Sequence, residues 1–131
     1  DGGLRKAMKA LSNGDVVGML VDLREESGID LPFLGYTAKT NTAPALMAQR
    51  YDAPIIMIAC IRLPGCRYEF RIEEIEQATT DDKKADVIET TLRINNAYSS
   101  LIRAFPDQWL WSHRRWPKKK KTKQAVTTNI P

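Results

Sequence analysis

Residues 53–63 read APIIMIACIRL, an apolar run with the length and branched side chains of a buried β-strand. A second continuous apolar run, VVGMLVD, covers residues 16–22. Strands that are apolar on both faces are typical of parallel sheets. Between the two runs, residues 43–50 form a short amphipathic helix with Asn41 or Thr42 as its N-cap. Strand, helix and strand of these lengths predict a right-handed parallel crossover.

The flanking segments extend this unit to an α/β domain. Apolar residues in helical spacing predict a first helix within residues 4–11, and residues 23–41 form a long polar loop interrupted by LPFLGY. Alternation in residues 67–76 predicts a half-exposed antiparallel edge strand. The longest helix is expected at residues 83–105, ended by Pro106. The fold class expected is therefore α/β, a mostly parallel sheet with a crossover helix, an antiparallel edge strand and a long C-terminal helix.

Residues 106–117, PDQWLWSHRRWP, contain all three tryptophans, the only histidine and an Arg-Arg pair. We expect the folded domain to end here, at residue 117, and residues 118–131, KKKKTKQAVTTNIP, to be a basic, disordered tail. Setting aside the seven Lys and Arg residues from Arg114 to Lys123 leaves 13 basic and 16 acidic residues, a net charge of −3. Such a concentrated cationic end suits an anionic membrane surface, a phosphorylated ligand or nucleic acid.

Several function classes find no support in the sequence. There is no glycine-rich phosphate loop, no serine nucleophile elbow and no cluster of metal ligands, so neither a metal nor a cofactor is expected. Two cysteines, Cys60 and Cys66, form no disulfide framework, and we expect reduced thiols. No apolar run approaches the ~20 residues that a membrane span needs.

Four polar residues at the ends of predicted elements are candidate ligand-binding groups. Asp22 ends the first predicted strand, at the sheet edge where open α/β folds place ligands, unless it caps a turn. Arg62 ends the second strand and faces either the same crevice or solvent. Thr40 and Thr42 precede the crossover helix, where hydroxyls and free amides bind phosphate or simply cap the helix.

The tryptophan-rich stretch allows three interpretations. Indole and guanidinium groups suit a membrane interface, where tryptophan lies at the headgroup level. They also suit single-stranded nucleic acid, whose bases stack on aromatic rings. In the third interpretation the tryptophans dock on the core and the arginines pair with surface carboxylates.

The same stretch, PDQWLWSHRRWPK, resembles the C-terminal signature of the bacterial lipid A biosynthesis acyltransferases, the late lauroyl or myristoyl transferases of the lysophospholipid acyltransferase-like superfamily. The resemblance continues upstream. It includes RKAMKALSNGDVVGMLVD at residues 5–22, LPFLGYTAKTNTAPALMAQRYDAPII at residues 31–56 and CIRLPGCRYEFRI at residues 60–72.

The resemblance implies transfer of a fatty acyl chain from acyl carrier protein to a hydroxyl of a phosphorylated glucosamine disaccharide lipid. It places this reaction on the cytoplasmic face of the bacterial inner membrane. It also implies a general-base histidine followed by an acidic residue. His113 does not match that motif, because Lys118 lies five positions on and no carboxylate follows Asp107. We therefore expect residues 1–117 to be the C-terminal part of an acyltransferase domain, inactive alone.

The family pattern gives Asp22 a supporting catalytic role, orienting substrate or a catalytic arginine, although Leu23 stands where the family often has Gln. Arg114 and Arg115 match the signature pair and are expected to hold the end of the fold or to contact anionic lipid. The substrate-binding candidates are Arg62, Thr40, Thr42, Arg114 and Arg115.

Two alternative functions remain. One is a related glycerophospholipid or glycolipid acyltransferase, and the other is a non-catalytic module that binds an anionic membrane or nucleic acid. The net charge of −3 on the body argues against nucleic acid as a partner.

Overall fold

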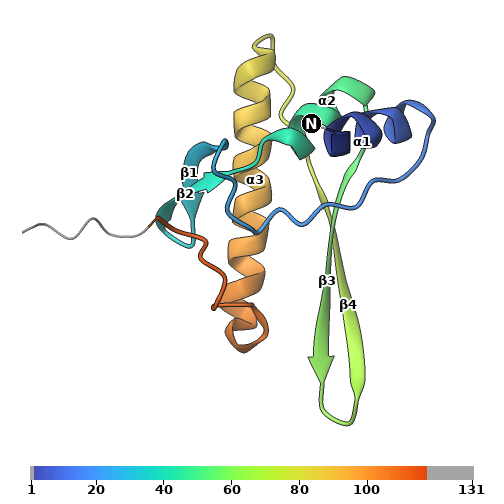
Figure 1. Ribbon diagram of the computed structural model, residues 1–131. Coiled ribbons are helices and arrows are strands. Elements are labelled where there is room, and N and C mark those ends of the chain that lie inside the picture. The colour runs from blue at the N-terminus through green and yellow to red at the C-terminus, as the bar shows by residue number, and fades with distance from the viewer. Residues whose placement is uncertain (1, 118–131) are drawn as a thin grey trace, which may run out of the picture.

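The computed structural model describes residues 2–117. These residues form three α-helices, two β-hairpins and a short 3-10 turn (Figure 1). The elements in chain order are α1 (Gly2–Ser12), β1 (Ile29–Phe33), β2 (Tyr36–Thr40), α2 (Ala43–Tyr51), β3 (Ile55–Leu63), β4 (Arg67–Ile75), α3 (Lys83–Ala104) and η1 (Pro106–Gln108). The predicted basic tail, residues 118–131, lies outside the described residues.

Helix α3 is the central element, with the β1–β2 hairpin on one side and α1, α2 and the β3–β4 hairpin on the other (Figure 1). The helix begins after Asp82, whose Oδ1 accepts hydrogen bonds from the N–H groups of Lys84 and Ala85 at 3.0 and 3.1 Å. This carboxylate satisfies two of the amides that every helix start leaves unpaired. The predicted long helix is thereby confirmed.

Residues 29–40 form a hairpin where a long loop was expected. The turn residues Leu34 and Gly35 both have positive φ, 51° and 87°, the backbone of a tight two-residue hairpin turn. Pairing runs from Ile29 opposite Thr40 to Phe33 opposite Tyr36. The prediction of an irregular loop was wrong because inward-facing apolar residues on both strands, Leu31, Phe33 and Ala38, bury the hairpin against α3.

The predicted apolar strand and edge strand form the second hairpin, β3–β4. All nine positions pair, from Ile55 opposite Ile75 to Leu63 opposite Arg67. One face is held to the core through its buried residues, which are Met57, Ile61 and Ile75. The opposite face exposes large apolar side chains, which are Ile56, Ile58, Tyr68, Phe70 and Ile72. Cys60 and Cys66 are both exposed and free.

The parallel crossover was not confirmed. Both sheets within residues 2–117 are two-stranded and antiparallel, and residues 16–22 run extended without strand pairing. In this segment Val16 and Leu20 are 96% and 80% exposed, whereas Val21 packs against the core. The prediction failed because the tight turn after β3 brings β4 beside it, and β3 pairs with β4 along its whole length. The fold is therefore mixed α/β with antiparallel sheets.

Two apolar clusters stabilise the molecule on either side of α3. Phe33, Ala38 and Ile102 form the first, and Met57, Ile75 and Ile94 form the second. Tyr98 packs against both clusters and so connects them. Within residues 2–117, no helix has the length and apolar character needed to cross a membrane.

Candidate functional site

The site is centred on Asp22, which lies half-buried in the extended segment after α1. Its Oδ2 accepts a hydrogen bond of 2.8 Å from the indole Nε1–H of Trp109, 87 residues further along the chain. Both residues line a cavity of about 190 Å³. The other lining residues come from β3, α3, η1 and the residue between α3 and η1, and they are Ala59, Cys60, Ile61, Tyr98, Leu101, Ile102, Phe105 and Gln108.

We call residues 106–117 the C-terminal clasp, because they fold back over the β1–β2 hairpin. Trp109 and Trp116 pack around Phe33, with ring centroids 5.8 and 6.0 Å from it, and lie 5.9 Å from each other edge to face. The Trp116 indole also donates to the Phe33 carbonyl oxygen at 3.3 Å. Such tilted aromatic contacts add stabilisation beyond the area that they bury. Two tryptophans of the clasp are thus docked on the core.

Arg115 anchors the clasp to the β1–β2 hairpin through buried hydrogen bonds. Its side chain is fully buried, and its Nη1 and Nη2 donate to the Lys39 carbonyl oxygen at 2.6 Å and to Thr40 Oγ1 at 2.9 Å. Its Cζ lies 4.5 Å from the centroid of the Phe33 ring. Burial lowers the pKa of Arg115, and the nearby Asp22 carboxylate opposes this shift. The arginine therefore bonds a carbonyl and a hydroxyl, not the surface carboxylates of the docking interpretation.

Thr40 and Thr42 lie in different environments. Thr40 is 2% exposed, and its Oγ1 accepts from Arg115 and, at 3.2 Å, from Asn95 Nδ2. Thr42 occupies the N-cap position of α2, but its side chain makes no capping hydrogen bond. Instead Asn41 Oδ1 accepts from the N–H of Ala43 at 2.9 Å.

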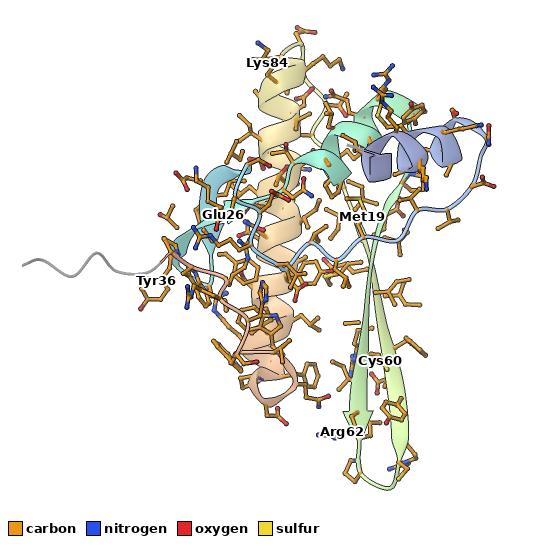
Figure 2. All side chains as sticks on the ribbon, viewed as in Figure 1. Met19, Glu26, Tyr36, Cys60, Arg62 and Lys84 are labelled. Carbon is orange, nitrogen blue, oxygen red and sulfur yellow. The ribbon has the colours of Figure 1, made fainter. Side chains whose placement is uncertain are left out.

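Arg62 and Arg114 are the more accessible cations among the predicted residues. Arg62 lies near the turn of the β3–β4 hairpin (Figure 2). Its backbone is fixed to the clasp, because its N–H donates to Gln108 Oε1 at 2.7 Å and its carbonyl accepts from Gln108 Nε2 at 3.1 Å. Arg114 is exposed, in contrast to its neighbour Arg115. The structure therefore bonds Thr40 to Arg115 and places the charge of Asp22 near Arg115, whereas the Arg62 side chain is exposed on the outer face of β3 and its backbone is tied to the clasp through Gln108.

Tyr98 adds a phenol to the walls of this cavity. Desolvation raises the pKa of Tyr98, and the negative charge of Asp22 raises it further. The phenol accordingly stays protonated at neutral pH. The cavity thus combines the Asp22 carboxylate with the Tyr98 phenol, two groups that can hold a substrate hydroxyl or cation.

Within residues 2–117, the side chain of His113 lacks hydrogen-bond partners of the kind found around Asp22. Its Nε2 is buried without a hydrogen-bond partner in the described part of the chain. A histidine that acts as a general base needs its second nitrogen oriented by another group. The described residues also contain no cluster of His, Cys, Asp or Glu that could hold a metal ion.

Sequence reasoning did not assign Trp109, Gln108, Tyr98 or Asn95 to the site. Tyr98 and Asn95 lie within a regular helix, where apolar spacing indicates a buried face but not what that face contacts. For Trp109 the only signal was its place in the family-like signature.

The sequence model of the bacterial lipid A biosynthesis acyltransferases matches residues 1–118. The chain therefore belongs to this family of acyltransferases. A comparison with curated proteins finds no match.

Proposed function

We propose that the chain serves in the transfer of a fatty acyl group from acyl carrier protein to a hydroxyl of a lipid A precursor, at the cytoplasmic face of the inner membrane. The observation that carries this proposal is the family match over residues 1–118. Acyl transfer requires a base for the acceptor hydroxyl and donors for the oxyanion. The Asp22 cavity supports this reaction by positioning groups rather than by supplying the base.

Asp22 has a geometry suited to positioning. Trp109 fixes Oδ2, while Oδ1 accepts no hydrogen bond within residues 2–117. A carboxylate held at one oxygen presents the other in a defined direction to a hydroxyl or to an arginine. We assign Asp22 the role of orienting the substrate or a catalytic arginine.

The remaining candidate substrate-binding residues differ in how far their side chains are exposed to solvent. Arg62 and Arg114 are exposed, and they contact the phosphate groups of the acceptor lipid or of its membrane in this proposal. Arg115 and Thr40 are buried and act on substrate through the clasp that they hold. Thr42 offers a hydroxyl at the start of α2, where an anion is stabilised by the helix dipole.

Replacement of Asp22 tests the proposal. In the protein as expressed from its own gene, Asp22→Ala should lower kcat/KM for transfer from an acyl carrier protein thioester by about 100-fold, because a misplaced reactant loses the advantage of orientation. The melting temperature should remain near that of wild type. Asp15→Asn is the matched control, since Asp15 is an exposed acid in the same segment. Full activity of Asp22→Ala would refute the assignment, and absence of transfer by the wild-type protein would refute the function.

A membrane-binding module without catalysis is the second candidate. The observation that favours it is the exposure of Leu110 and Trp111, 66% and 54%, beside the exposed cation Arg114. Apolar and aromatic groups next to a cation are typical of membrane interfaces. Vesicle binding that depends on anionic lipid and weakens with salt, without acyl transfer, would support this candidate instead.

A further inference from the structure

We propose that Trp109 is a positioning residue for the reaction, and that its indole N–H sets the orientation of the Asp22 carboxylate. The inference rests on the proposed function. Its basis is the 2.8 Å bond from Trp109 Nε1 to Asp22 Oδ2, at the wall of the 190 Å³ cavity.

The segment that carries Asp22 has little else to hold it. Between Asp15, whose N–H donates to Ala10, and Glu25, whose N–H donates to Lys39, the described chain shows no backbone hydrogen bond. Val21 packs against the second apolar cluster, which limits the position of the segment but not the rotation of its carboxylate. Within residues 2–117 the bond from Trp109 is the side-chain hydrogen bond of Asp22, and it adds a defined direction to the attraction of the nearby Arg115 charge.

Trp109 itself is rigidly placed. Its ring lies 5.8 Å from Phe33, 4.7 Å from Trp111 and 5.9 Å from Trp116. The preceding residue, Gln108, bonds both backbone groups of Arg62 in β3. Because the indole is fixed by several contacts, its N–H points in one direction. A donor of this kind can hold an anionic side chain in one rotamer.

A packing role for the ring must be separated from the role of its N–H. Trp116 provides the control, because it belongs to the same aromatic cluster and its indole also donates, but to the Phe33 carbonyl oxygen rather than to Asp22. Trp109→Phe and Trp116→Phe each remove one indole ring and one N–H bond. Only Trp109→Phe removes the contact with Asp22.

Kinetics of the protein expressed from its own gene give the first test. Trp109→Phe should lower kcat about tenfold with KM within about twofold, while Trp116→Phe should leave kcat within about twofold at a similar loss of melting temperature. The double variant with both Asp22→Asn and Trp109→Phe should have nearly the same kcat as the single variant Asp22→Asn, because the two residues act as a unit. The role of Trp109 would be overturned if Trp109→Phe and Trp116→Phe lowered kcat equally. It would also be overturned if the loss of kcat in the double variant equalled the product of the losses in the two single variants.

Nuclear magnetic resonance of the 131-residue chain gives a readout that does not need activity. Asp22→Asn should shift the indole N–H signal of Trp109 and leave that of Trp116 in place. An unmoved Trp109 signal would show that the bond is absent and would overturn the inference. Lack of acyl transfer by the wild-type protein would overturn the proposed function together with this role, whereas normal kcat of Trp109→Phe in an active enzyme would overturn only the role.

Discussion

Two adjacent arginines of one signature lie in opposite environments. Arg114 is exposed, whereas Arg115 is fully buried over the Phe33 ring with hydrogen bonds to Lys39 and Thr40. The sequence pattern could identify the pair but not assign the two roles. Their side chains are chemically identical, and only the path of the clasp decides which one points inward.

Replacement of each arginine by methionine separates the two roles. Arg115→Met should lower the free energy of unfolding by about 3 kcal/mol, because the Lys39 carbonyl and Thr40 hydroxyl lose a charged donor in a buried position. Arg114→Met should change it by less than about 0.5 kcal/mol. Chemical denaturation of both variants measures the difference. Equal stabilities would contradict a net stabilising role for the Arg115 hydrogen bonds.

At the scale of elements, sequence patterns identified five segments well. The predicted bounds lie within about two residues of the observed ones for α1, α2, β3, β4 and α3, since periodicity, caps and turns are local signals. Two segments were missed. Residues 16–22 have the composition of a buried strand, yet β3 pairs with β4 instead. Residues 29–40 were placed in a polar loop interrupted by LPFLGY, yet alternate apolar side chains bury them as a hairpin against a distant helix.

The start of α3 should show a distinctive pH dependence. Asp86 is buried, and its pKa is held below its ordinary value of 3.8 by hydrogen bonds from the Thr80 hydroxyl and backbone N–H, aided by Lys83 and opposed by burial. A group with a lowered pKa contributes stability above its ordinary pKa, and this contribution is lost as pH falls through the lower, folded value.

The free energy of unfolding of the wild-type chain should accordingly fall as pH drops below 3.8. Thr80→Val should make this fall with pH less steep, because it removes one of the hydrogen bonds that lower the pKa of Asp86. Thr79→Val is the matched control, because Thr79 is also exposed and makes no hydrogen bond to Asp86. Denaturant unfolding across a pH series measures the slopes. The prediction fails if Thr80→Val and Thr79→Val give the same slope.

At the scale of the whole molecule, α3 divides the structure into two packed units. The clasp and the β1–β2 hairpin enclose Phe33, Ala38 and Ile102, while the β3–β4 hairpin contributes Met57 and Ile75 to the other cluster. Tyr98 contacts both clusters. This division could not be read from the sequence, because the clasp bonds residues 46 to 87 positions earlier in the chain. Contacts of such separation leave no local pattern.

The division predicts that local openings of the two units are separable. Trp116→Ala removes an aromatic partner of Phe33 and should speed amide hydrogen exchange mainly in β1 and β2, because the first cluster loses its cover. Ile75→Ala should lower the free energy of unfolding by about 3 kcal/mol and speed exchange mainly in β3 and β4. Hydrogen exchange read by mass spectrometry compares the two variants. Equal acceleration of exchange in both hairpins by each variant would contradict the prediction. It would mean that the two packed units open together, because a loss of packing on one side of α3 would then destabilise the other side as well.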